Sequence, residues 1–151
     1  MRIREAGDED QELVVRMRLA FLADESGLEA VSEALAADTH RFVLAEHEAG
    51  RLRSWLAEDD DECVGIVSLV LHAVPPNPRV ASDVEGYVVN MYVAPAHRGR
   101  GTGRVLLGTL EAAARAGGLR RLTLHATETG RPLYEAAGFT TDGTWMKRFL
   151  G

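Results

Sequence analysis

The first part of the chain alternates apolar and polar residues at helical spacing. Leu13, Met17 and Phe21 lie four positions apart, and the acidic run 8–10 before them suits a helix N-terminus. A second helix is predicted from about residue 28 to residue 50, with a bend near Thr39. Its apolar face is expected to comprise Val31, Leu35 and Phe42.

After residue 50 the pattern changes to short apolar runs rich in β-branched residues, separated by acidic, proline or glycine turns. Asp142-Gly143 is a hairpin turn signal near the C-terminus. The predicted strands, with residues 2–5 at the N-terminus, are 2–5, 55–58, 63–72, 87–93, 121–126, 139–141 and 144–150. Trp55 and Trp145 are expected to lie in the core.

Two further helices are predicted among the later strands. One follows the strand that Pro95 ends and finishes at the pair Gly117-Gly118, and a short one covers 131–137. Strands and helices in this mixed order indicate one α+β (mixed α/β) domain, residues 1–151, built around a single sheet.

Charge is distributed unevenly along the chain. Residues 1–62 carry 17 acidic and 7 basic side chains, a balance of −10, and the rest carry 6 and 10, a balance of +4, which together give the net −6. A net acidic chain is a poor candidate for nonspecific nucleic-acid binding, so no nucleic-acid partner is expected. The basic half is suited to a compact anion, and the acidic half either favours a cationic partner or is solvated surface.

The content of cysteine and of long apolar runs narrows the class of protein further. Cys63 is the single cysteine, so neither a disulfide framework nor a cysteine-rich metal site is expected, and Cys63 itself is predicted to be buried packing. No apolar run has the length of a membrane span, and residues 1–10 do not resemble a secretion signal. A cytoplasmic location without membrane contact is the expectation.

Residues 93–107 (VAPAHRGRGTGRVLL) combine glycines and arginines at the predicted start of a helix. A helix N-terminus has unpaired N–H groups and partial positive charge, and glycines let a ligand approach the main chain closely. This turn is therefore predicted to bind phosphate. The Walker and dinucleotide patterns both fail here, because no lysine follows the glycines and the third glycine of G-x-G-x-x-G is replaced by Arg104 or Leu106.

The turn resembles the pyrophosphate loop of the GCN5-related N-acetyltransferases (GNAT), [QR]-x-x-G-x-[GA] after a strand ending in valine. Arg98, Gly101 and Gly103 fill that pattern, and Val93 ends the strand. The later family signature, L-Y-x-x-x-G-F, is matched by residues 133–139 (LYEAAGF). The resemblance covers nearly the whole chain and implies a mostly antiparallel central sheet of six to seven strands flanked by four helices.

By this resemblance the chain uses acetyl-CoA, without a metal, and transfers the acetyl group directly to an amine. The main chain of Met91, Tyr92 and Val93 would pair with the pantetheine arm as an added strand. Thr127 stands where the family often has asparagine and still offers a hydroxyl. The residues expected to bind the pyrophosphate are Arg98, Gly99, Arg100, Gly101, Thr102, Gly103 and Arg104.

Tyr134 is the predicted general acid, because a phenol is still protonated at neutral pH and can donate to the departing thiolate. The strand glutamate common in the family is replaced by Val89 or Tyr87. Glu85 is the candidate base, with a solvated loop carboxylate as the alternative interpretation. His72 and His125 are further candidates for proton relay, against a structural role for each.

Two other functions remain open from the sequence: a non-catalytic acyl-CoA sensor, and a transferase of a different acyl group. The acceptor is expected to be a primary amine on a small molecule or peptide, and the acidic half favours a cationic one. Members of the family often form homodimers, so a homodimer is a further expectation.

Overall fold

A single five-stranded sheet runs through the centre of the computed structural model, which describes residues 1–151. Neighbouring strands are antiparallel except for the last pair, β4 and β5, which is parallel. In spatial order, the strands are β1 Arg2–Glu5, β2 Leu52–Asp59, β3 Glu62–Ala73, β4 Val84–Val93 and β5 Leu122–Thr123. The mixed, mostly antiparallel architecture is confirmed, and the predicted count of six to seven strands is wrong.

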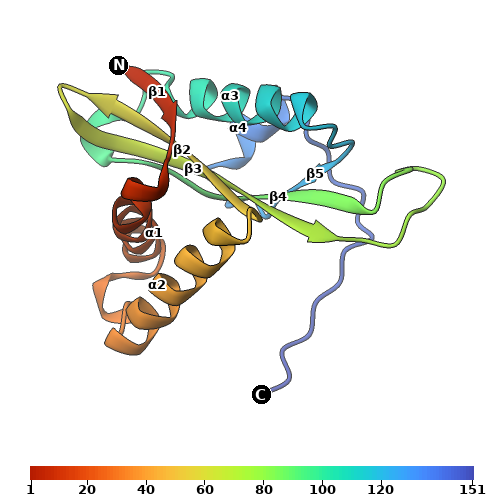
Figure 1. Ribbon diagram of the computed structural model, residues 1–151, viewed down its shortest axis with the longest axis horizontal. Coiled ribbons are helices and arrows are strands. Elements are labelled where there is room, and N and C mark those ends of the chain that lie inside the picture. Colours follow the sequence, from red (N-terminus) through yellow and green to blue (C-terminus); the bar gives the residue numbers. More distant parts are fainter.

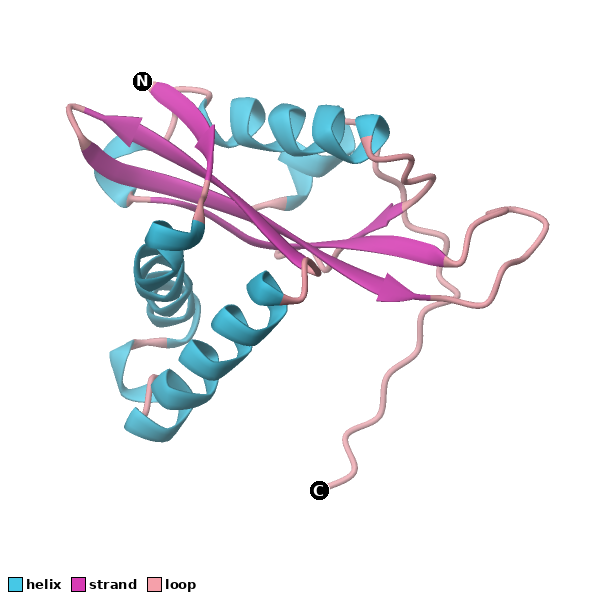
Figure 2. Cartoon of the chain, viewed as in Figure 1, coloured by secondary structure: helices cyan, strands magenta, loops and turns pink.

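The helices cover the sheet on both faces (Figure 1). One pair lies below the sheet and the other pair above it in that view, and the long C-terminal segment leaves the body of the molecule as a loop (Figure 2). The helices are α1 Gln11–Ser26 and α2 Glu33–Glu48 on one face, and α3 Thr102–Ala116 and α4 Arg131–Ala136 on the other. The expectation of four flanking helices is confirmed.

Each face of the sheet has its own apolar core. The larger one joins the sheet to α3 and α4 and includes the fully buried Leu106, Leu107 and Leu110, at the helical spacing that the sequence shows. The smaller one joins the sheet to α1 and α2 and includes Val14 and Leu56. Fully burying one leucine stabilises the fold by roughly 1.5–3 kcal/mol, so these two layers fix the sheet between its helices.

Helix α2 differs from its prediction in its start and its buried face. Its N-cap is Ser32, whose hydroxyl accepts the N–H of Leu35 at 3.1 Å. The helix continues through Thr39 without a break and buries Thr39 and Val43, four positions apart. Phe42 is 51% exposed, because the stripe that faces the sheet lies on the neighbouring side of the helix.

The predicted C-terminal hairpin has its turn but not its strands. Asp142 accepts the N–H of Thr144 at 3.0 Å, and Gly143 has a positive φ of 72°. No strand pairing follows, and Trp145, expected in the core, is 73% exposed. An isolated hairpin is marginal in water, and β5 with two residues is a short edge for a further strand.

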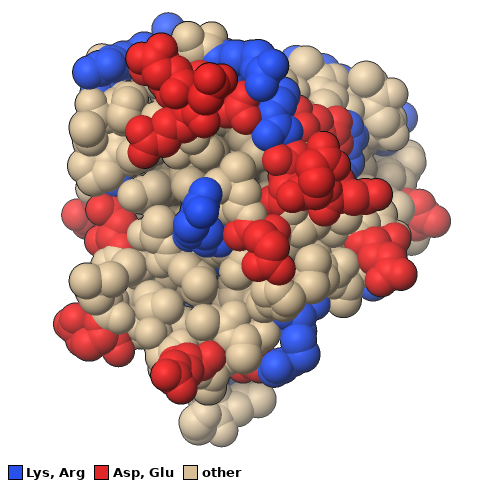
Figure 3. Space-filling model, turned by 60° about the vertical axis from the view of Figure 1, so that its left-hand side comes forward, with Lys and Arg blue, Asp and Glu red and all other residues tan.

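Ion pairs neutralise much of the acidic half of the chain. Arg4 binds Asp10 through two hydrogen bonds of 2.6 and 2.8 Å, and this arginine lowers the pKa of Asp10 to about 2. Acidic side chains are spread over the face in Figure 3, with basic side chains between them. Further pairs within 4 Å join arginine to acid at Arg2–Glu58, Arg4–Glu58, Arg41–Asp38, Arg51–Glu46 and Arg53–Glu5. The acidic excess is therefore a weaker argument for a cationic partner than the residue count implies.

Candidate functional site

Strands β4 and β5 diverge after two paired residues. Gly86 and Tyr87 of β4 pair with Leu122 and Thr123, and no strand lies beyond Tyr87 on that edge of β4. The register against β3 shifts between Ile66 and Ser68, where β4 carries one extra residue. This bulge includes Asn90, whose φ of 58° lies in the left-handed region.

The end of β4 therefore has main-chain groups without a strand partner. The N–H of Ala94 binds the carbonyl of Val64 on β3, so by alternation the groups of Met91 and Val93 face the open edge. Both residues are partly buried. A ligand in extended conformation can pair there as an added strand with Met91 and with the N–H of Val93, whose carbonyl already accepts from Arg98. Tyr92, for which the same pairing is predicted, lies opposite Ile66 and directs its main-chain groups toward β3.

The glycine turn has the backbone shape that anion binding requires. Gly99 and Gly101 have positive φ values of 75° and 83°, and a Cβ at either position would meet no atom within 4 Å. Helix α3 begins at Thr102, and its first intrahelical bond runs from Val105 to the carbonyl of Gly101. The N–H groups of residues 102–104 thus have no intrahelical partner. The turn is an open cradle of main-chain donors at a positive helix end.

The three arginines of the turn differ in their surroundings. Arg98 donates from Nε to the carbonyl of Val93 and from Nη2 to Asp24 of α1, each at 2.8 Å, and stacks over Tyr92. Its guanidinium is therefore used to fix the turn against β4 and α1. Arg100 and Arg104 are exposed and have no acidic partner within 4 Å, so their charge is available to an anion.

Three further residues are predicted to contact the co-substrate: Thr102, Gly103 and Thr127. Thr102 is 4% exposed and its hydroxyl points to Met1, so its N–H is the group left for a ligand. Gly103 packs near Leu133 and Met91, which joins the turn to α4 and β4. Thr127 accepts the N–H of Gly130 at 3.1 Å, and its hydroxyl proton remains free to donate.

Tyr134 lies in α4 with its ring in the larger core. The side chain is 9% exposed, and the ring meets Phe139 edge-on with centroids 5.9 Å apart. Burial, with a smaller contribution from the negative charge of Glu25, raises the pKa of Tyr134 to about 12, so the phenol is protonated at neutral pH. No protein group accepts its hydroxyl proton, which leaves that proton to be donated to a ligand.

Glu85 lies within β4, which begins at Val84, and not in a solvated loop. It is 2% exposed and forms an ion pair with Arg121, accepts the hydroxyl of Thr123 at 3.3 Å, and lies 3.6 Å from Nε2 of His72. Six residues of strand, about 20 Å, separate it from Met91. These partners give Glu85 a structural role near the start of β4, and its role as a base stays a prediction.

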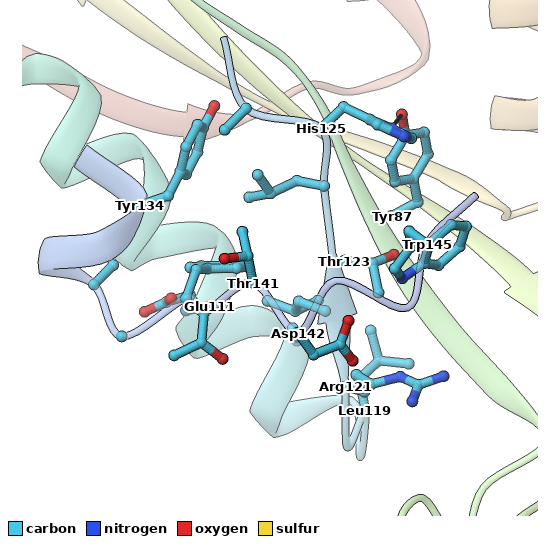
Figure 4. A pocket seen from close by; sticks show the side chains of 18 of the residues that line it. Tyr87, Glu111, Leu119, Arg121, Thr123, His125, Tyr134, Thr141, Asp142 and Trp145 are labelled. Carbon is cyan, nitrogen blue, oxygen red and sulfur yellow. Dashed lines mark hydrogen bonds between the residues drawn. The ribbon is translucent and has the colours of Figure 1, made fainter. Parts of the chain in front are cut away.

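A large cavity, about 1760 Å³ and open to solvent, lies beside β5 and includes no residue of the glycine turn. Tyr134 lies on one side of it with its hydroxyl directed away from Thr141 and Asp142, and Tyr87 and His125 lie across from it (Figure 4). The Tyr87 hydroxyl and Nδ1 of His125 share a hydrogen bond of 2.8 Å. Residues 139–145 of the C-terminal segment also line this cavity, and they form no strand beside β5.

Two residues near the open edge were missed by sequence reasoning. Arg18 of α1 donates to Asn90 of the bulge at 2.9 Å, and Asp24 holds Arg98. Arg18 occupies the same helix face as Val14 and Phe21, so a charged residue within an apolar stripe was the available signal.

Two absences complete the description of the site. No cluster of three or more His, Cys, Asp or Glu side chains is arranged to bind a metal ion. None of the helices combines the length and the apolar composition that a membrane span requires.

Comparison with known proteins agrees with the geometry. The chain is similar to a predicted acetyltransferase from Clostridium acetobutylicum solved with acetyl-CoA, at 25% identity and a TM-score of 0.89 over 99% of this chain and 96% of that one. It is similar to a GCN5-related N-acetyltransferase from Ralstonia eutropha JMP134, at 30% identity and a TM-score of 0.88 over 99% of both chains.

A curated relative and a family model give the assignment. The uncharacterized N-acetyltransferase YycN of Bacillus subtilis (strain 168) is 33% identical over 85 residues, which span 54% of this chain and 52% of that protein. The model of the acetyltransferase (GNAT) family matches residues 18–139, which include both the glycine turn and Tyr134. The chain therefore belongs to the GNAT acetyltransferase family.

Proposed function

We propose that this chain transfers the acetyl group of acetyl-CoA directly to a primary amine. The observation that carries the proposal is the pairing of two features at one end of the sheet: a cradle of main-chain donors at residues 99–104, and an unpaired edge of β4 beside it. The first fits a diphosphate and the second fits an extended pantetheine arm. The Clostridium structure, solved with acetyl-CoA, supports the same co-substrate.

The chemistry assigns a separate task to each residue. The co-substrate supplies a thioester whose carbonyl carbon is attacked by the amine nitrogen. The N–H of Met91 donates to the carbonyl oxygen, which stabilises the negative charge that develops there. Tyr134 gives its proton to the sulfur as the carbon–sulfur bond breaks, and the amine proton passes to a base or to water.

Tyr134 can act as this acid because its environment keeps it neutral. Its pKa of about 12 lies above that of a thiol, near 8.5. Donation to a thiolate is therefore uphill by itself and depends on the phenol being the nearest donor in a partly dry site. The competing function is a CoA-binding sensor without chemistry, which the ion-paired state of Glu85 favours, because that carboxylate is not free to act as a base.

An amine-panel assay that follows release of the CoA thiol separates these functions. We expect turnover with at least one amine, and a decrease in kcat of about 100-fold in Tyr134→Phe, in line with the loss of one general acid. Tyr87→Phe is the matched control, because it removes the other phenol hydroxyl that lines the cavity. CoA affinity, measured by calorimetry, should be nearly the same in both variants.

Three results would contradict the proposal in different ways. CoA binding without turnover on any amine would favour the sensor. Equal turnover in wild type and Tyr134→Phe would remove the phenol from the mechanism. Faster turnover with succinyl-CoA or propionyl-CoA than with acetyl-CoA would change the acyl group.

A further inference from the structure

Arg18 is a half-buried cation beside the open edge of β4. Its guanidinium donates to Oδ1 of Asn90 at 2.9 Å and lies 5.5 Å from the centroid of the Phe21 ring. A guanidinium has five N–H donors, and this hydrogen bond uses one of them. Burial lowers the pKa of Arg18, which marks its charge as poorly solvated.

A buried polar row holds Asn90 in one orientation. Its side-chain nitrogen donates to the hydroxyl of Ser68 at 3.1 Å, and that hydroxyl shares a hydrogen bond of 2.7 Å with Ser54. Ser54, Ser68 and Asn90 are each 5% exposed or less. Since the Asn90 nitrogen is committed to Ser68, its oxygen must face Arg18, and the row fixes the position of the guanidinium.

No carboxylate lies within ion-pair distance of Arg18. Of the seven arginines in residues 1–62, five have an acidic partner within 4 Å, and only the exposed Arg16 and the half-buried Arg18 have none. Leaving a half-buried charge without a counterion is costly, whereas arginine pairs well with a carboxylate through two hydrogen bonds. The unused donors of Arg18 therefore indicate a site for an anion.

A negative side chain influences the region around Arg18 at the open edge of β4. Asn90 immediately precedes Met91, whose main chain faces the open edge. The charge of Glu25, two turns of α1 beyond Arg18, acts on Arg18 and on Tyr134 alike. A single cation whose charge Glu25 already offsets in part suits the one negative charge of a carboxylate better than the two charges of a phosphate.

We infer that Arg18, positioned by Asn90 and Ser68, binds the carboxylate of the acceptor, so that the substrate class is an amine that also carries a carboxylate. This inference rests on the proposed transfer to an amine and names the class of acceptor. It replaces a purely cationic amine with a zwitterion such as an α-amino acid.

Binding of matched ligand pairs tests the inference without relying on turnover. CoA-loaded protein is titrated by calorimetry with each of the common α-amino acids and its carboxamide, and with phosphoethanolamine and ethanolamine. At least one amino acid should bind at least tenfold more tightly than its amide. Arg18→Met keeps the stem that packs on Phe21 and should abolish that difference, and Arg16→Met, an exposed arginine of the same helix, should leave it intact.

Each other outcome overturns the inference. Equal binding of acid and amide for every pair would exclude carboxylate recognition, and a difference that survives in Arg18→Met would assign it to another residue. A preference for phosphoethanolamine over ethanolamine that exceeds every carboxylate preference would indicate a phosphate site. Melting temperature and CoA affinity of Arg18→Met report on folding.

The same titrations separate this inference from the proposed function. Carboxylate binding that depends on Arg18 in a protein that transfers no acetyl group would contradict the transferase and leave the anion site standing. Acetyl transfer to amines with no preference for a carboxylate would do the reverse.

Discussion

Strand β4 is built differently at its two ends. At its start, Gly86 and Tyr87 have a neighbour on each edge, and Glu85 is buried in an ion pair with Arg121. Toward its end, beyond the bulge at Asn90, one edge has no neighbouring strand. We call these the closed end and the open end of β4.

The difference shows how one strand can serve both the fold and a ligand. Unpaired main-chain groups that are shielded from water are costly, so the open end is stable only with water or a ligand as partner. The closed end supplies the rigidity, because its polar groups are satisfied within the protein. The bulge lies between them and reverses which residues point to the free edge.

The largest expected effect is at the open end. Gly101→Val should raise the Kd for CoA by about 100-fold or more, because a β-branched residue at a φ of 83° is strained and its side chain would occupy the space above the cradle. Calorimetry measures the affinity. Gly108→Val is the matched control: it lies within α3 with open space around it and should bind CoA normally. Normal CoA affinity in Gly101→Val would contradict the assignment of CoA binding to the open end.

At the closed end we expect a substitution to lower the stability of the fold instead of the affinity for CoA. Glu85→Gln leaves Arg121 without its carboxylate and should lower the free energy of unfolding by about 2 kcal/mol, a value below that for fully buried pairs because Arg121 is 40% exposed. Urea denaturation measures it. Glu135→Gln, which removes an exposed pair of 3.9 Å with Arg131, should cost less than about 0.5 kcal/mol.

Turnover of Glu85→Gln decides the second role of this residue. We expect kcat to change by less than about threefold, because the ion pair with Arg121 gives Glu85 a structural role. Loss of a general base would lower kcat by roughly 100-fold or more. A large decrease in kcat with unchanged stability would instead make Glu85 the base.

The boundary between the two ends should show a reversal of the usual order of alanine and glycine. Alanine within a strand is normally more stable than glycine by about 0.5–1 kcal/mol. At Asn90 the φ of 58° penalises alanine, so Asn90→Gly should be more stable than Asn90→Ala by about 1 kcal/mol. Thermal and urea unfolding of both variants measure the difference, and the ordinary order would show that the bulge is not preserved.

The smallest expected effect concerns the pH profile of kcat, which should contain no step that depends on Tyr134. Tyr134 loses its proton only as the pH rises through about 12, so the phenol is a competent donor at every lower pH. We therefore expect kcat between pH 6 and about 10 to have no descending limb that disappears in Tyr134→Phe. Such a limb with its midpoint near the ordinary tyrosine pKa of about 10 would mean that the hydroxyl is far better solvated than its 9% exposure implies.

The features that the sequence predicted well are those with local causes. The helix after the turn follows from the spacing of Leu106 and Leu110, and the open cradle follows from Gly99 and Gly101, where only positive φ closes the turn. Tyr134 is named from its motif, and its role as the acid stays a prediction.

The features that were missed depend on partners far along the chain. The face of α2 that is buried is set by the sheet, so Phe42 was misplaced although its spacing is helical. Glu85 lies outside the predicted strand 87–93, because the partner that holds it in the sheet, Arg121, lies 36 positions later in the sequence. The C-terminal strands are predicted from the Asp142-Gly143 hairpin signal, but a ladder needs an edge of sufficient length, and β5 offers two residues.

The engagement of Arg98 has a consequence for how this loop tolerates change. With that side chain tied to Val93 and Asp24, the diphosphate would be gripped by amide hydrogens that every amino acid possesses. Substitutions at the neighbouring exposed positions then change the surface charge but leave the main-chain donors in place, provided that the backbone keeps its conformation. Recognition of the proposed co-substrate therefore depends on backbone conformation more than on side-chain charge.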